Sequence, residues 1–364
     1  MDTVTHGLAG WLIARAIPPV AGNSEAVKAV KREATVAMVL GAVLPDADNI
    51  ASLLGSEFYI RLHRGVSHSF AGIAITSLAV ALLFHKFGKW KDLKKLYLLV
   101  LLGQLSHIGL DLLNSYGTQI FQPFSNARVS FDLLFIVDLA FTGIIVLGIL
   151  LSRHSPSRAR AALAVLTVYV GFAAFLHLRA EEAVRYAAVR NGVPVVSAWA
   201  LPRLPEIRSL PDLTPGRRAE AAQKPKFEEV APGLAAIARR DRFPIPAGPC
   251  AWNGFVDDGR TYLRAEVNPF DGAVDWKERE WKGREAPEAK ALRDLQDVRT
   301  YLWFARFPTV RVATEDGKTV VTFLDMRFGG PTTRRPFVLR VIESPGRSPQ
   351  TQWGSLEAGA ARTR

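Results

Sequence analysis

The stretch "SFAGIAITSLAVALLFHKF", residues 69–87, is apolar over most of its nineteen positions and carries one formal charge, at Lys86. A helix needs about 20 residues to cross a hydrocarbon layer of ~30 Å, so this stretch predicts a transmembrane helix. Three later segments predict further spans, namely Lys95–Leu113, Leu133–Ser152 and Ala161–Leu178. Two shorter apolar segments, Val4–Ile17 and Ala34–Leu44, are expected to complete the bundle as short helices covered by protein neighbours.

The distribution of charge divides the 364-residue chain into two parts. Residues 1–178 contain 15 Lys+Arg and 10 Asp+Glu, whereas residues 179–364 contain 31 and 24. We therefore expect an all-α transmembrane helical bundle, with about four full spans and two short N-terminal helices, followed by a soluble α+β domain. The expected boundaries are a membrane-embedded domain at 1–178, a helix and proline-rich linker at 179–244, the α+β domain at 245–345 and a disordered tail at 346–364.

The second half offers strand-like segments such as "KTVVTFLDMRF" at 318–328, and a helical pattern at 286–304. Charges of both signs are mixed throughout, so the net charge of +12 predicts no nucleic-acid partner. Cys250 is the only cysteine, which excludes an intrachain disulfide and a thiolate metal cage. No histidine follows His177. We expect the soluble domain to cover a site in the membrane domain, to select its substrate or to bind an envelope partner.

Basic residues predict the orientation of the bundle. If the six segments alternate across the membrane, 12 of the 15 Lys and Arg residues of the first half fall in or beside the turns 18–33, 88–94 and 153–160. Short loops rich in Lys and Arg stay in the cytoplasm. The N-terminus, segments 45–68 and 114–132, and everything after residue 178 are therefore expected on the non-cytoplasmic side.

On that side the sequence places imidazole and carboxylate groups of the types found in metal sites. His107 and Asp111 are four residues apart, so one helical face presents both. Imidazole with carboxylate suits zinc or a similar divalent ion, and we predict one or two ions. The predicted ligands are His6, Asp46, His63, His68, His107 and Asp111, and the predicted catalytic carboxylates are Asp46 and Asp48. The competing interpretation is interfacial histidines bonded to carbonyls, and aspartates that form turns and caps.

Other polar residues of this side have supporting roles in the prediction. Arg61, Arg64 and Arg128 are expected to clamp an anionic substrate, because guanidinium groups match phosphate oxygens. They would alternatively bind lipid headgroups or pair with Glu57 and Asp132. Asn114 and Asp138 are expected to hold the ligands in place without binding the metal. For Asp138 we alternatively expect a contact that pairs its helix with a neighbouring one.

The motifs "MDTVTHG", "LPDAD", "HRGVSHS", "HIGLDLLNSYGTQIFQPFS" and "IVD" resemble the YdjM-like family of membrane-bound metal-dependent hydrolases, over roughly residues 1–140. The order of the ligands is also similar to that of the zinc-dependent phospholipase C enzymes. Those enzymes carry a second His-x-x-x-Glu for a three-metal cluster, whereas we expect one or two ions here. The resemblance implies hydrolysis of a phosphate ester or lipid-like substrate at the outer face of a bacterial inner membrane, with a free aspartate as general base.

Two other functions compete with a hydrolase. Intramembrane His and Asp also mark cation and proton pathways, so a transporter is one alternative. An inactive membrane anchor for the C-terminal domain is the other. The depth of the site in the membrane separates a hydrolase from a transporter, because a transport site belongs near the bilayer midplane.

Overall fold

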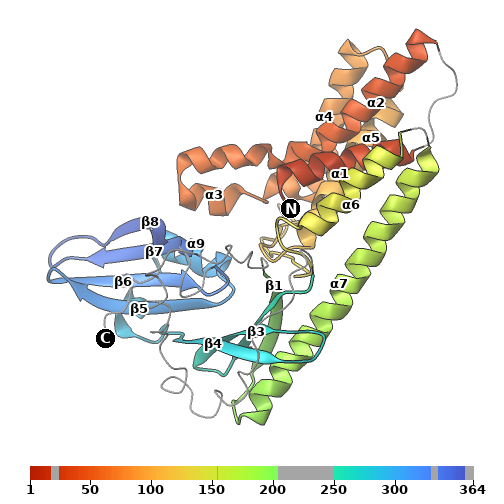
Figure 1. Ribbon diagram of the computed structural model, residues 1–364. Helices are drawn as coiled ribbons and strands as arrows, with labels where there is room; N and C mark the ends of the chain where they lie inside the picture. The colour runs from red at the N-terminus through yellow and green to blue at the C-terminus, as the bar shows by residue number, and fades with distance from the viewer. Residues whose placement is uncertain (18–23, 154, 204–248, 329–334, 357–364) are drawn as a thin grey trace, which may run out of the picture.

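The computed structural model describes residues 1–17, 24–153, 155–203, 249–328 and 335–356 (Figure 1). A helical part comes first, and two small β-sheets follow it. The seven helices of the first part are α1 (Thr3–Ala16), α2 (Glu25–Val43), α3 (Ser56–Leu62), α4 (Phe70–Phe87), α5 (Leu93–Leu112), α6 (Leu139–Leu151) and α7 (Pro156–Arg190). Two 3₁₀ segments, η1 (Leu44–Leu54) and η2 (Val66–His68), lie between α2 and α4.

Four helical segments are long and apolar enough to cross a membrane, which confirms a transmembrane bundle of about four spans. They are Glu25–Leu54, Phe70–Phe87, Leu93–Leu112 and Pro156–Arg190. The predicted span Leu133–Ser152 is wrong, because α6 begins only after Asp138, whose side chain caps it, and has 13 residues. The predicted short helix Ala34–Leu44 is wrong in the other direction. Helix α2 begins after its cap Ser24, ten residues before Ala34. The first turns of α2 carry charged residues, so hydropathy does not identify them as part of an apolar helix.

Small residues allow α2 and α5 to pack with their backbones in contact. A Cβ atom on Gly103 would lie 2.4 Å from Met38 O, and one on Gly41 would lie 2.4 Å from Val100 O. Such glycine contacts replace the hydrophobic driving force that membrane helices lack. The close approach fixes the end of α2 against the face of α5 that carries His107 and Asp111.

The second part contains two four-stranded antiparallel sheets with the strand orders β1-β2-β3-β4 and β5-β6-β7-β8. The strands of the first are β1 (Ser197–Pro202), β2 (Trp252–Asp257), β3 (Thr261–Val267) and β4 (Val274–Trp281). Helices α8 (Pro287–Ala291) and α9 (Gln296–Phe304) come next. The strands of the second are β5 (Pro308–Glu315), β6 (Lys318–Asp325), β7 (Arg335–Glu343) and β8 (Gln350–Leu356). The predicted soluble α+β domain is confirmed.

The predicted domain boundaries differ from the structure at both ends of this domain. Helix α7 continues without a break through the expected boundary at 178, and its last turns, with Ala180 and Val184, form the core of the first sheet with Trp252 and Trp276 (Figure 1). Strand β1 lies inside the expected linker, and β8 lies inside the expected disordered tail. Strand β1 is short and lies in a proline-rich stretch, and β8 is short and polar, so both resemble loops in sequence. The remainder of the linker, 204–244, and the tail from 357 lie outside the described residues.

Candidate metal centre

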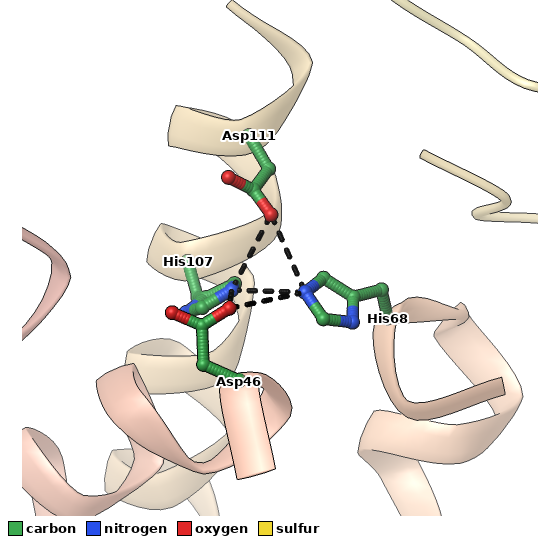
Figure 2. Close-up of side chains that lie close together, drawn as sticks. All are labelled: Asp46, His68, His107 and Asp111. Carbon is green, nitrogen blue, oxygen red and sulfur yellow. Dashed lines mark hydrogen bonds and ion pairs between the residues drawn. The ribbon is translucent and has the colours of Figure 1, made fainter. Parts of the chain in front are cut away.

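Four buried side chains point toward one another at one end of the bundle: Asp46 from η1, His68 from η2, and His107 and Asp111 from α5 (Figure 2). The Nε2 atoms of His68 and His107 lie 3.0 Å apart. Asp111 Oδ2 lies 3.3 Å from the first Nε2 and 3.4 Å from the second. Asp46 Oδ1 lies 3.8 Å from His68 Nε2 and 3.5 Å from His107 Nε2. We call these four residues the metal cluster.

Hydrogen bonds on the outer sides of the two rings leave both Nε2 atoms free to bind a cation. His107 Nδ1 donates to the carbonyl oxygen of Ala42 at 2.7 Å, so the neutral ring has an unprotonated Nε2. Ser67 donates its only hydroxyl proton to Asp48, so His68 Nδ1 is the donor to Ser67 Oγ at 2.9 Å. Two lone pairs at 3.0 Å repel each other unless a positive charge lies between them. Asp111 Oδ2 is buried and accepts no hydrogen bond from the described residues.

The separations of the cluster fit one small divalent ion. Ligand bonds of ~2.0–2.1 Å in a tetrahedral site place neighbouring ligand atoms ~3.4 Å apart. Five separations in the cluster run from 3.0 to 3.8 Å. The structure thus brings buried imidazole and carboxylate groups into the geometry of a metal site.

The local sequence explains how the ligands meet. His107 and Asp111 share one face of α5 through their four-residue spacing. Pro45 starts the tighter 3₁₀ segment that turns Asp46 inward from the end of α2. Arg64 adopts a left-handed backbone with a φ of 60°, which redirects the chain between α3 and η2. Its amide donates to Asp48 Oδ2 at 3.0 Å, which stabilises this strained conformation.

Asp48 and His63 lie beside the cluster as a hydrogen-bonded pair. His63 Nδ1 lies 2.7 Å from Asp48 Oδ1, and Asp48 Oδ2 lies 3.2 Å from His68 Nδ1. Asp48 therefore orients two imidazoles, in the way that carboxylates behind metal-bound histidines commonly do. Burial lowers the pKa of His63, against the raising effect of the bond to Asp48. Asp46, Asp48 and His63 also form a second group with ligand atoms within 4.8 Å of one another.

His6, a predicted ligand, lies against the metal cluster but outside its four ligand atoms. Its ring stacks on that of His107 with the centroids 3.6 Å apart, and its Nε2 lies 3.2 Å from Asp111 Oδ1. Burial lowers the pKa of His6 to about 4, although the bond to Asp111 acts in the opposite direction. His6 is thus a neutral ring that holds two ligands in place.

The three predicted substrate arginines occupy different environments. Arg64 is buried, and its guanidinium lies 2.8 Å from Asp111 Oδ1 and donates to Asn114 Oδ1 at 2.8 Å. Arg61 is exposed and pairs with Glu57 at 3.3 Å, as the alternative interpretation had it. Arg128 is half-buried and donates to the carbonyl oxygens of Ile60 and Gly117. The structure therefore brings only Arg64 into contact with the metal cluster.

The two predicted supporting residues have separate functions. Asn114 holds Arg64, which in turn holds Asp111, so it acts one contact behind the metal cluster. Asp138 lies in the cap of α6 rather than inside a helix, and accepts a hydrogen bond from Tyr169 OH of α7 at 2.8 Å. It pairs α6 with α7 as expected, and it makes no described contact with the metal cluster.

Sequence reasoning missed a residue of the C-terminal domain that reaches this region. Arg327, just after β6, donates to the carbonyl oxygens of Ser115 at 3.0 Å and Tyr116 at 3.4 Å. The Tyr116 amide donates to Asn114 Oδ1, so hydrogen bonds connect Arg327 through Asn114 and Arg64 to Asp111. Arg327 is more than 200 residues from these partners in sequence, and no local pattern marks it.

Replacement of Arg327 by alanine is expected to weaken metal binding by up to about tenfold, at the low end of the effect of losing a direct partner of a metal ligand, because Arg327 acts on Asp111 only through Asn114 and Arg64. Titration of metal-free protein with Zn²⁺ or Co²⁺ measures this affinity, and the Co²⁺ absorption spectrum reports the coordination geometry. Arg340→Ala is the matched control, because Arg340 pairs with Glu315 on the second sheet, away from the helical part. Unchanged affinity in Arg327→Ala would show that the C-terminal domain does not support the ligands.

The fold and this centre define a membrane protein with a helical bundle, a buried His and Asp cluster that is suited to a metal ion, and a C-terminal α+β domain. Residues 1–180 match the family model described as YdjM inner membrane protein, which confirms that part of the resemblance seen in the motifs. The Uncharacterized protein YfhP of Bacillus subtilis (strain 168) is 33% identical over 136 residues, which are 37% of this chain. That match spans 41% of YfhP, less than half of its length. No solved structure matches the chain.

Proposed function

We propose that this protein is a metal-dependent hydrolase that cleaves a phosphate ester, most simply in a membrane lipid, at the non-cytoplasmic face of the bacterial inner membrane. One observation carries the proposal: four buried ligand atoms lie within 4.8 Å of one another, and five of their separations are 3.0–3.8 Å. Two imidazoles with two carboxylates favour zinc among the common divalent ions. The phospholipase C likeness supports the same chemistry.

Four protein ligands close a tetrahedral site, whereas catalysis needs an open position. We assign Asp46 as the ligand that leaves the open position, because its distances from the two Nε2 atoms, 3.5 and 3.8 Å, are the longest. It also belongs to the second group with Asp48 and His63. Asp46 would be the ligand that leaves room for water at a single ion, and it would serve both groups if two ions bind, so the prediction of one or two ions stands.

A divalent ion bound there supplies an activated water and polarises the scissile ester. His63 is the proposed general base. Its Nδ1–H is held by Asp48, and its Nε2 makes no hydrogen bond in the described part of the chain. As the water oxygen bonds to phosphorus, His63 Nε2 takes the proton, and it returns that proton to the alkoxide when the ester P–O bond breaks. This assigns to His63 the base role first expected of a free aspartate, Asp46 or Asp48. Asp46 is a ligand in the proposal, and Asp48 already accepts hydrogen bonds from His63, Ser67 and the Arg64 amide.

The surroundings of the site support a lipid substrate. Segments η1 and α3 lie side by side and project from the bundle beside the C-terminal domain (Figure 1). On α3, Tyr59 and Ile60 face the C-terminal domain, while Phe58 and Leu62 remain exposed. The exposed apolar side chains of this projection are Ile50, Leu53, Leu54, Phe58 and Leu62. An apolar surface that begins at Asp46 and ends at His63 suits a substrate with acyl chains.

The position of the metal cluster supports a hydrolase over a transporter. Asp111 is one residue from the end of α5, and His68 comes two residues before the start of α4. A transport site is expected near the bilayer midplane and between broken helices. The lysines of the turn 88–94 lie at the opposite ends of α4 and α5, which supports the non-cytoplasmic placement of the metal cluster.

The test is hydrolysis by purified protein in nanodiscs, with Zn²⁺ supplied, of bis(p-nitrophenyl) phosphate and of phospholipids followed by ³¹P NMR. His63→Asn is expected to lower kcat about 10²–10⁴-fold, the usual contribution of a general base, while bound metal stays at the wild-type level. His85→Asn, at the far end of α4, is the control. Wild-type turnover in His63→Asn would overturn its role, and fully loaded protein that cleaves none of these substrates would overturn the proposed function.

A further inference from the structure

Next to the metal cluster, several buried hydrogen-bond donors have no partner. Few buried polar groups in native structures lack a hydrogen-bond partner, and a bound ligand, ion or water commonly explains the exceptions. Here they gather on one loop and the two arginines beside it. Within the described residues, the donors without a partner here are Arg64 Nε, Asn114 Nδ2, Ser115 Oγ, Tyr116 OH, Thr118 Oγ1, Gln119 Nε2 and Arg128 Nε. Arg64, Asn114, Tyr116, Thr118 and Gln119 are each less than a tenth exposed.

Contacts between these residues show that they form one site. The guanidinium carbons of Arg64 and Arg128 each lie 5.0 Å from the centroid of the Tyr116 ring. Asn114 Oδ1 accepts from the Arg64 guanidinium and from the Tyr116 backbone amide, and the Gln119 backbone amide donates to Arg64 O at 3.0 Å. The loop 114–119 therefore wraps around the two arginines.

The charge of the site favours an anion. Arg64 is neutralised by Asp111, and Arg327 by Asp325 at 2.7 Å. Arg128 donates to two carbonyl oxygens and lies over the rings of Tyr116, Trp303 and Phe304, and it has no carboxylate partner in the described part of the chain. Burial lowers the pKa of Arg128 to about 10, so it stays cationic at neutral pH. A half-buried guanidinium among neutral donors leaves one positive charge uncompensated.

We propose that Arg64, Arg128 and the loop 114–119 bind a phosphate-type oxyanion next to the metal cluster. The tetrahedral oxygens of a phosphate accept several hydrogen bonds at once, and arginine forks match them. Arg64 contacts both the anion site and Asp111, so a phosphate held there lies beside the candidate metal. The inference assigns the residues that hold the phosphate of the proposed hydrolase's substrate and to that extent rests on the proposed function, but anion binding is measurable without metal and without turnover.

The experiment uses chelator-treated full-length protein in nanodiscs and measures binding of inorganic phosphate by calorimetry and by the shift in Tm. Phosphate is expected to raise the Tm of the wild type, and Arg128→Gln to lower phosphate affinity at least tenfold. Arg61→Gln is the matched control, because Arg61 is exposed and already paired with Glu57. Nanodiscs that contain phosphatidic acid, compared with phosphate in solution, show whether the anion is a lipid headgroup or a free phosphate.

Thr118→Val is a second variant in case Arg128→Gln does not fold. It replaces one buried hydroxyl with a methyl group of similar shape, so the fold is expected to be retained. It is expected to weaken phosphate binding and to raise the Tm of the phosphate-free protein, since an unpaired donor is removed. Absence of any phosphate effect on the wild type, or equal phosphate affinity in the wild type and both variants, would overturn the anion site. Hydrolysis with no anion binding would leave the proposed function standing, whereas anion binding with no hydrolysis would contradict only that function.

Discussion

Replacement of His107 by alanine is expected to remove nearly all metal binding from this protein. The ring supplies one of four ligand atoms, and its Nε2 lies within 3.5 Å of the ligand atoms of His68, Asp111 and Asp46. A four-ligand zinc site is worth roughly 10–16 kcal/mol, so one ligand accounts for about 3 kcal/mol, or a 100–1000-fold loss of affinity. Metal analysis of protein purified side by side with the wild type measures this loss.

Two variants make the result specific. Asp111→Asn keeps the size of the side chain and removes the charge, so it is expected to lower metal affinity without removing the bond to Arg64. His85→Ala removes a histidine from the other end of α4 and is expected to keep the wild-type metal content. Equal metal content in His107→Ala and the wild type would show that the four side chains do not form a metal site.

The helical half of the fold was largely readable from sequence, with two informative exceptions. Hydropathy found α4, α5 and the membrane part of α7, because their apolar runs are uninterrupted. It extended α6 by six residues, because "LLFIV" is apolar and nothing local shows that Asp138 ends a loop rather than lying in a helix. It shortened α2, whose first turns carry Lys28, Lys31 and Arg32 and extend beyond the apolar run.

For the candidate site, the sequence indicated which residues lie there but not which of them are ligands and which hold the ligands in place. Spacing alone showed that His107 and Asp111 share a helical face, and the structure agrees. Spacing says nothing about whether His6 binds a metal or stacks on a ligand, because both roles need the same residue at the same position. The Asp48 and His63 pair depends on the backbone turn at Arg64, which is a tertiary result.

The C-terminal half shows more clearly what local sequence patterns do not predict. Strands β1 and β8 were assigned to a linker and a tail, because an edge strand of six or seven residues gains its stability from pairing rather than from its own composition. The contact of Arg327 with Ser115 and Tyr116 joins segments far apart in the chain. Only the folded arrangement of both parts reveals that the C-terminal domain helps to fix the loop behind Asp111.

The second large effect is expected from Gly103→Ala, through packing rather than ligation. A Cβ atom on Gly103 would lie 2.4 Å from Met38 O and 2.8 Å from Ala42 N, and backbone cannot rotate away as a side chain does. Helices α2 and α5 must therefore separate, at a cost of roughly 3 kcal/mol or more in the free energy of unfolding. Because Ala42 O accepts the hydrogen bond from His107 Nδ1, the same separation is expected to weaken metal binding.

Gly109→Ala is the matched control for this prediction, since it lies on the same helix. Nothing lies within 4 Å of a Cβ atom at Gly109, so alanine is expected to be neutral or to stabilise α5 by up to about 1 kcal/mol through helix propensity. Thermal unfolding in detergent and Zn²⁺ affinity are measured for both variants. If Gly103→Ala unfolds at the same temperature as Gly109→Ala, the two helices do not pack through their backbones, and the position of Ala42 O behind His107 loses its structural basis.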